Sequence, residues 1–259
     1  MTMYRRELLS LGVFALLPQV RLGAQASPGL DNLIGDLVAA NHILATEGIV
    51  DGYGHISVRS PRNKDRFYLS RSVAPESVTA ADILEHGLDG EAIDPKGKTS
   101  YKERFIHSEI YRVRPDVNAV VHCHAPSLIP FGVTKVPLRP MYHQSAFLAA
   151  GVPVFEIREA GGMTNMLVET AALGRALAKT LGDKPAALMR GHGAVVVADT
   201  IPNVVGRSIY LEINARVQAQ AIALGGPITY IDPEEAKKYA ASDNYSRAWE
   251  LWKKKAAGR

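Results

Sequence analysis

Two histidines separated by one residue end a short apolar run in Ala119-Val120-Val121-His122-Cys123-His124. Small and β-branched residues of this kind are typical of a buried strand. Side chains two residues apart on a strand leave on the same face, so His122 and His124 would present two imidazoles side by side. Because imidazole nitrogens bind transition metals, the pair predicts part of a metal site at the end of this strand.

A third histidine, His192, lies between Gly191 and Gly193, where one apolar run ends and another begins. Glycine allows a tight turn and a close backbone approach, which would bring this imidazole near the other two. Upstream, Glu103 lies on a helix-like run, 102–112, and adds a carboxylate. Three histidines and one carboxylate suit one divalent ion per chain. Zinc is our first expectation, with manganese, iron and cobalt as alternatives.

Glu103 and His107 are four residues apart on the expected helix and hence on one face. His107 is therefore predicted to orient the carboxylate, to support the site from behind the residues that touch the metal, or to contact a substrate, and a plain surface pair is the alternative. His42 and His86 have no partners in any pattern. We expect them to be ordinary core or surface histidines.

The elements that must position these groups begin with an amphipathic helix over 30–48, which ends at a glycine. A strand within 51–59 and a second over 66–70 enclose a polar loop and predict a hairpin. Four polar side chains would then cluster near strand ends as binders of a substrate carboxylate: His55, Ser57, Arg71 and Ser72. Ordinary turn chemistry is the alternative for each.

Farther along, the patterns predict a short helix over 126–133 and longer helices over 165–181 and 203–224. Cys123 would point away from the flanking histidines, into the core. Because no repeat or linker divides the chain, we expect one domain over 27–226. The aromatic tail, 227–259, is predicted to be an interface or a lid.

As a set, the motifs resemble the class II aldolase/adducin family over about Leu30 to Gly226. They are Gly54-His55-Ile56-Ser57-Val58-Arg59, Glu103-x-x-x-His107, Arg114-Pro115-Asp116-x-Asn118-Ala119-Val120-Val121-His122-x-His124 and Arg190-Gly191-His192-Gly193. The resemblance implies an α/β fold with three αβα layers and a central, mainly antiparallel sheet. It also implies a homotetramer with active sites at subunit interfaces.

By this resemblance, His122, His124 and His192 match the metal-binding histidines, and Glu103 matches the acid/base carboxylate that can also touch the metal. Tyr142 or His143 matches a tyrosine that the aldolases donate across the subunit interface as a proton source. Of the two, His143 has the better pKa for such work.

The sequence differs from the sugar-phosphate aldolases of this family at the residues that bind the substrate phosphate in those enzymes. Those enzymes have Gly-Asn before a Ser-x-Arg and Ser-Ser before the acid/base Glu, where this chain has Gly54-His55 and Tyr101-Lys102. A phenol and a lysine cannot form the same phosphate site, although Lys102 alone could meet an anion. It looks more like the decarboxylase branch, which acts on hydroxylated aromatic dicarboxylates such as hydroxy-methylpyridine dicarboxylate and dihydroxyphthalate. We expect a metal-dependent carbon-carbon lyase, first a decarboxylase of such an acid. The alternatives are an aldolase that cleaves a hydroxy-carbonyl, sugar-phosphate-like substrate, a non-haem iron oxygenase and a non-catalytic adducin-like binding module.

Residues 1–26 are predicted to be a signal peptide of the twin-arginine type. Arg5-Arg6 precede an apolar run, 8–20, that is too short to span a bilayer, and Ala24-Gln25-Ala26 is a small-x-small cleavage site. The mature chain would be periplasmic and free of the membrane. An uncleaved extension on a cytoplasmic enzyme is the alternative.

The charge of the chain argues against a nucleic-acid partner. The formal net charge is +4, and removal of residues 1–26 takes away three arginines and one glutamate, which leaves +2. So small and scattered an excess favours a small-molecule substrate. A single cysteine excludes an intramolecular disulfide.

Overall fold

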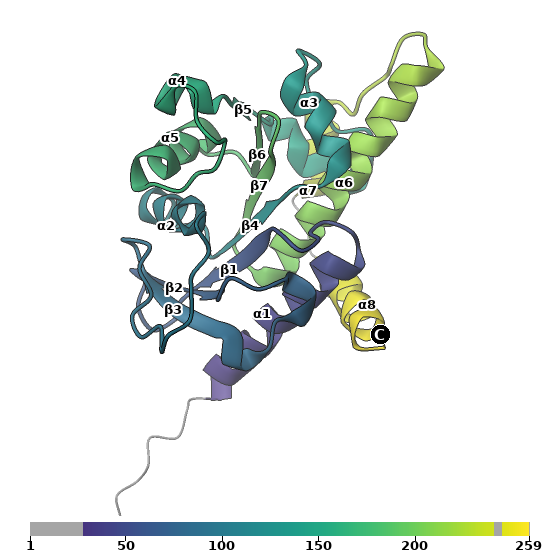
Figure 1. Ribbon diagram of the computed structural model, residues 1–259. Helices are drawn as coiled ribbons and strands as arrows, with labels where there is room; N and C mark the ends of the chain where they lie inside the picture. Colours follow the sequence, from purple (N-terminus) through teal and green to yellow (C-terminus); the bar gives the residue numbers. More distant parts are fainter. Residues whose placement is uncertain (1–27, 241–244, 259) are drawn as a thin grey trace, which may run out of the picture.

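A seven-stranded sheet lies between two helical layers (Figure 1), with the strand order β3-β2-β1-β4-β7-β6-β5. Neighbouring strands are antiparallel except for β5 and β6, which are parallel. This computed structural model describes residues 28–240 and 245–258. The predicted three-layer αβα fold with a mainly antiparallel sheet is confirmed. The predicted signal peptide lies outside the described residues.

Short strands form the sheet, and most are buried along their whole length. They are β1 (His55–Arg59), β2 (Arg66–Ser70), β3 (Ile83–Gly87), β4 (Ala119–Cys123), β5 (Val154–Phe155), β6 (Ala186–Met189) and β7 (Gly193–Ala198). The predicted hairpin is confirmed, since β1 pairs with β2. On its other side β1 pairs with β4, and this pairing sets His55 opposite His122.

The helices form the outer layers. The α-helices are α1 (Pro28–Thr46), α2 (Arg104–Val113), α3 (Ile129–Val133), α4 (Ile157–Gly161), α5 (Ala171–Leu181), α6 (Ile201–Leu224), α7 (Pro233–Ala240) and α8 (Ser246–Ala257). Among the described residues, 3-10 turns lie between strands or between a strand and a helix: η1 (Pro75–Ser77), η2 (Ala80–Asp82), η3 (Pro126–Leu128) and η4 (His143–Ala150). In the described residues, no helix combines the length and the apolar character that crossing a membrane requires.

The sheet separates two apolar cores, because successive side chains of a strand point to opposite faces. On β4, Val121 and Cys123 pack into the core beneath α1 and α6, whereas Val120 faces the core beneath α2 and α5. His122 points to the second face. Cys123 is buried as predicted, and its burial raises the pKa of the thiol to about 12.

One predicted helix begins later than its apolar pattern indicated. We expected a helix from residue 165, yet α5 starts at Ala171. Asn165 accepts a hydrogen bond from the backbone of Leu167, and Thr170 caps the helix by accepting one from Leu173. These side chains satisfy backbone groups in a turn and so compete with an earlier helical start.

The C-terminal segment packs on its own chain. Helix α7 lies beside η4, and α8 packs against α1 and α6. Trp249 and Trp252 of α8 are buried in the same core as Cys123. Helix α8 therefore belongs to the helical layer of this domain, and a role of the tail as an interface or a lid stays a prediction.

His86 on β3 is a core histidine, as expected. It is fully buried, stacks on Phe67 at 5.2 Å between ring centroids, and lies 3.0 Å from the hydroxyl of Ser100. Burial lowers its pKa from 6.5 to about 4. Between these two values the unfolded chain binds more protons than the folded chain.

The contribution of His86 to stability is therefore complete above pH 6.5 and decreases as the pH falls toward 4. We expect the metal-free wild type to lose more free energy of unfolding than His86→Gln between pH 7 and pH 4. Urea denaturation of both proteins at the two pH values measures this difference. Equal losses would contradict the assignment.

Candidate metal centre

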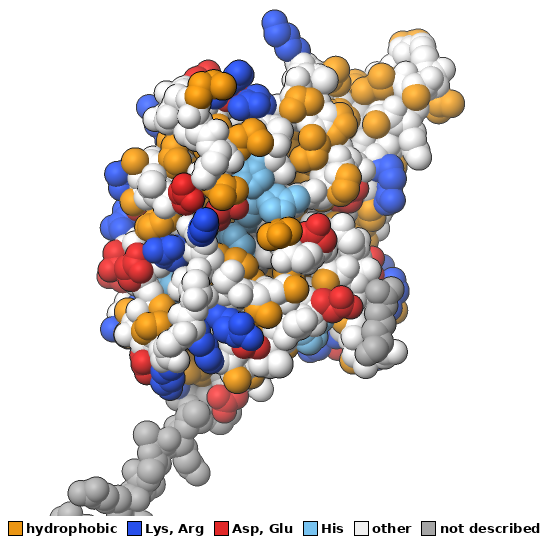
Figure 2. All heavy atoms as spheres, viewed as in Figure 1, with side chains coloured by type: hydrophobic (Ala, Val, Ile, Leu, Met, Phe, Trp, Pro, Cys, Tyr) orange, Lys and Arg blue, Asp and Glu red, His pale blue; other side chains and the backbone are white. Residues whose placement is uncertain are grey.

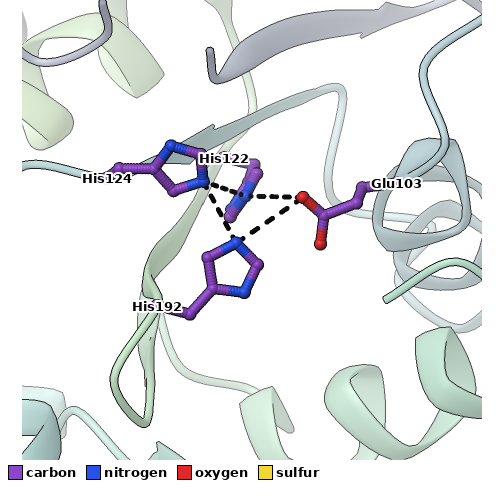
Figure 3. A group of neighbouring side chains, drawn as sticks. All are labelled: Glu103, His122, His124 and His192. Carbon is purple, nitrogen blue, oxygen red and sulfur yellow. Dashed lines mark hydrogen bonds and ion pairs between the residues drawn. The ribbon is translucent and has the colours of Figure 1, made fainter. Parts of the chain in front are cut away.

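Four predicted ligands converge at one end of the sheet (Figure 3). Nε2 of His124 lies 3.1 Å from Nε2 of both His122 and His192. Oε2 of Glu103 lies 3.3 Å from Nε2 of His122 and 3.5 Å from that of His192. Tetrahedral zinc with bonds of about 2.0–2.1 Å places its ligands about 3.3–3.4 Å apart. The set therefore has the spacing of a metal site.

The hydrogen bonds of the rings show which nitrogen faces the site. Nδ1 of His122 lies 3.1 Å from the carbonyl of Ala194, and Nδ1 of His192 lies 3.0 Å from that of Met166. A carbonyl can only accept, so each Nδ1 carries a proton, and Nε2 is the nitrogen of each ring that can offer a lone pair to a metal. Burial, with His122 and His192 nearby, lowers the pKa of His124 to about 4, so its ring is neutral near pH 7. Lone pairs that converge on a carboxylate repel one another unless a cation lies between them, and this donor set fits a divalent metal.

The glycines beside His192 have the role that the sequence indicated. Gly191 has φ +63°, in the left-handed region that glycine tolerates. A Cβ on Gly193 would lie 2.0 Å from the carbonyl oxygen of Cys123. Any other residue here would separate β7 from β4, and so His192 from the other two ligands.

Glu103 lies at the N-cap of α2, one residue before the helix proper. Its Oε1 accepts a hydrogen bond of 2.9 Å from the backbone N–H of Val168, which directs Oε2 toward the histidines. Burial alone would raise the pKa of this carboxyl. A positive charge among the ligands, here a proton on Nε2 of His122 or His192, more than offsets burial and holds its pKa below the usual range. Glu103 is therefore a carboxylate at neutral pH.

A cavity of about 650 Å³ opens beside these ligands, and both Glu103 and His124 line it. Figure 2 shows pale-blue histidine side chains at the centre of this face, in a hollow. Cavities of this size accommodate small organic ligands. The remaining wall consists of Gly52, Tyr53, Gly54, His55, Ser72, Val73, Ala74, Tyr101, Lys102 and Leu167.

The structure separates the predicted substrate-binding residues into two groups. His55 and Ser72 line the cavity. Ser57 and His107 are completely buried behind His55 and are not part of the cavity wall. The hydrogen bonds of His107 go to His55 and Ser57, so the prediction that it orients Glu103 is wrong. A surface pair of Glu103 and His107 is also excluded, since both are buried.

Arg71 does not take the position expected of a carboxylate binder. Its Nε lies 2.6 Å from Oδ1 of Asp82, and it is not among the residues that line the cavity. Asp82 also accepts hydrogen bonds from Thr79, which together with Arg71 lower its pKa to about 2. The guanidinium is therefore engaged within the chain. The sequence could not reveal this pairing, because the two residues lie on separate elements.

Tyr142 and His143 lie away from the four ligands, at the start of η4. They line a separate cavity of about 340 Å³ together with Tyr239 of α7. Their predicted role requires a neighbouring subunit to bring them to the metal, and it stays a prediction.

The predicted substrate-binding residues do not include three side chains of the cavity wall: Tyr53, Tyr101 and Lys102. Tyr53 is 73% exposed at the cavity and lies between two glycines, a pattern that could have indicated a binding loop. Tyr101 lies in the wall, with its ring centroid 4.5 Å from that of His55. Lys102 is exposed and has no ion-pair partner among the described residues, which leaves its ammonium available to an anion.

Residues 35–219 match the family model described as the class II aldolase and adducin N-terminal domain, and the chain belongs to this family. Among curated proteins, the decarboxylase tropJ of Talaromyces stipitatus is 35% identical over 83% of this chain and 90% of its own length. The 3,4-dihydroxyphthalate decarboxylase of Rhodococcus jostii is 32% identical over 81% of this chain and 90% of its own length. Among solved structures, L-fuculose 1-phosphate aldolase from Glaciozyma antarctica matches with a TM-score of 0.72 and 25% identity over 92% of both chains.

These relatives are decarboxylases and an aldolase, both of which are lyases that act on small molecules. The similarity supports a lyase, as expected from the motifs. The family and its decarboxylase branch were identified correctly from the sequence.

Proposed function

We propose that this chain is a divalent-metal-dependent decarboxylase of a hydroxylated aromatic acid. One observation carries the proposal: the Nε2 atoms of His122, His124 and His192 converge with Oε2 of Glu103 beside a cavity large enough for a substituted benzene ring. The relatives that act on 3,4-dihydroxyphthalate support the choice of substrate class.

The three histidines would hold the ion, and Glu103 would touch it or act beside it. A bound divalent ion supplies an electron sink for the negative charge that develops when a carbon-carbon bond breaks. In the overall reaction a carboxylate leaves as carbon dioxide, and a proton takes its place on the ring carbon. Because Glu103 is ionised at rest, it first accepts a proton at Oε2, for example from the substrate hydroxyl. It then delivers this proton to the ring carbon.

The remaining wall suits a planar acid. Tyr53 and Tyr101 provide aromatic surface, and Leu167 provides apolar surface that excludes water. Lys102 is placed to attract a second carboxylate at the cavity. This assignment replaces the one that the sequence favoured, in which Arg71 held that group.

The same wall argues against a sugar-phosphate substrate. The hydroxyl of Tyr101 donates to the backbone carbonyl of Val73 and lies 3.4 Å from Ser70. It is therefore engaged inside the protein and does not replace the serine hydroxyls that bind phosphate in the aldolases of the family. An aldolase with another hydroxy-carbonyl substrate remains the second candidate, which the similarity to L-fuculose 1-phosphate aldolase favours.

The test is an anaerobic assay of purified protein loaded separately with Zn²⁺, Mn²⁺, Fe²⁺ or Co²⁺. The substrates are 3,4-dihydroxyphthalate, related hydroxybenzoates and L-fuculose 1-phosphate. We expect release of carbon dioxide from an aromatic acid and loss of this activity on chelation. Aldehyde release from the sugar phosphate alone would favour the aldolase, and turnover that requires oxygen would favour an iron oxygenase. Full activity without metal would refute the mechanism.

The proposal extends to assembly and location. We propose a homotetramer in which Tyr142 or His143 of one subunit reaches the metal site of its neighbour, and export of the mature chain to the periplasm. Light scattering of the purified protein tests the first. Fractionation of cells that express the chain with and without residues 1–26 tests the second.

A further inference from the structure

A chain of buried polar side chains leads from the cavity into the protein. Nδ1 of His55 lies 2.6 Å from Nε2 of His107, and Nδ1 of His107 lies 2.7 Å from the hydroxyl of Ser57. That hydroxyl lies 2.8 Å from the hydroxyl of Tyr111. Residues from β1 and α2 thus form one hydrogen-bonded series whose first member, His55, lines the cavity.

The direction of these hydrogen bonds depends on Tyr111, at the far end. Its proton can go to Ser57 at 2.8 Å or to the carbonyl of Asn118 at 3.4 Å. The carbonyl of Asn118 already accepts the backbone N–H of Arg59 at 2.7 Å. The shorter contact is the stronger hydrogen bond, so Tyr111 donates to Ser57.

The remaining donors follow in sequence. Ser57 accepts the hydrogen bond from Tyr111, and its own O–H donates a hydrogen bond to Nδ1 of His107. The proton of His107 is then on Nε2, and this N–H donates a hydrogen bond to Nδ1 of His55. Burial lowers the pKa of His107 to about 3 and raises that of Tyr111, so both side chains are neutral at pH 7. A His55 ring that accepts a hydrogen bond at Nδ1 has no proton there and therefore carries its proton on Nε2.

Nε2 of His55 is open to the cavity. It has no hydrogen-bond partner among the described residues, and it is not among the buried polar atoms that lack one. His55 pairs with His122 across β1 and β4, and the two ring centroids are 5.2 Å apart. The N–H group therefore lies next to the metal ligands, where an oxygen of the substrate would lie.

We propose that Tyr111, Ser57 and His107 fix His55 as a neutral N–H donor to an anionic oxygen of the substrate. The proposal rests on the proposed function and adds a catalytic donor with three positioning residues. A donor so fixed binds a carboxylate or phenolate oxygen and stabilises charge that develops there. It cannot act as a base, because its lone pair is turned inward, toward His107.

The first test is spectroscopic and needs no substrate. Histidine-selective ¹⁵N labelling of the zinc-loaded protein reports which ring nitrogen carries the proton, and His55→Gln assigns the signals. We expect both His55 and His107 to be protonated on Nε2. A His55 that is protonated on Nδ1 would overturn the proposal, whatever the enzyme does to any substrate.

The second test uses two variants of the positioning residue. His107→Gln retains an amide that can accept from Ser57 and donate to His55, whereas His107→Leu removes both hydrogen bonds. In His107→Leu we expect the His55 ring to be a mixture of two neutral forms, one protonated on Nδ1 and one on Nε2. In His107→Gln we expect only the form protonated on Nε2. His42→Leu is the matched control, because His42 contacts Val78 and lies outside the series.

Kinetics complete the test once carbon dioxide release has been detected. Loss of one preorganised donor to a developing oxyanion typically costs about 10²–10³ in kcat. We expect His55→Phe to lose this much with its zinc retained, and His107→Gln to recover much of what His107→Leu loses. Equal losses in the glutamine and leucine variants would overturn the positioning role. If no acid is decarboxylated at all, the proposed function fails, while the protonation of His55 still decides this inference.

Discussion

His122→Ala is expected to abolish both bound metal and turnover. His122 has no exposed surface, and its Nε2 lies within 3.3 Å of both His124 and Glu103. Loss of a residue that hydrogen-bonds to a metal ligand lowers the affinity for the metal by about 10–100-fold. Loss of the ligand itself should lower this affinity by more than the upper end of that range. An ion that stabilises developing charge by several kcal/mol contributes about 10²–10³ or more to the rate.

Metal analysis after dialysis, together with kcat for carbon dioxide release, measures both effects. Because alanine leaves a void at a buried position, His122→Gln provides a variant of similar volume and should give the same result. His42→Ala is the matched control, since this histidine of α1 contacts Val78 and no metal ligand. A His122→Gln protein that binds zinc as the wild type does would refute the site.

The sequence was sufficient to predict that the three histidines converge, because local geometry constrains them. Alternation along a strand places His122 and His124 on one face, and glycines that flank a histidine indicate a close approach of backbone. Both inferences depend only on neighbours in the chain. The hairpin of β1 and β2 was predictable for the same reason.

The cavity wall was harder to predict because it depends on pairings between distant elements. Arg71 appeared free in the sequence, but the fold brings Asp82 to 2.6 Å from it. From the sequence, Ser57 and His107 were predicted to contact the substrate. The pairing of β1 with β4 and the packing of α2 instead bury both side chains behind His55. The sequence alone allowed Lys102 to meet an anion, but only the fold places it at the cavity without an ion-pair partner among the described residues and so favours it over Arg71.

Glu103→Gln is expected to separate metal binding from catalysis. The amide has nearly the size of the carboxylate, and its oxygen can still accept the backbone N–H of Val168. The three histidines keep their lone pairs, so zinc should remain bound, although less tightly. An amide cannot take up a proton and deliver it at neutral pH, and loss of such proton transfer costs about 10²–10⁴-fold in turnover.

The informative measurement is therefore kcat per bound zinc, determined alongside Glu169→Gln as a control. Glu169 accepts a hydrogen bond from Asn165 and does not contact the ligands, so its variant should match the wild type. A kcat for Glu103→Gln close to that of the wild type would show that another group moves the proton, and His143 of a neighbouring subunit would then be the next candidate. Loss of zinc instead would show that Glu103 acts mainly as a ligand. Only retained zinc with lost turnover supports the role proposed for Oε2.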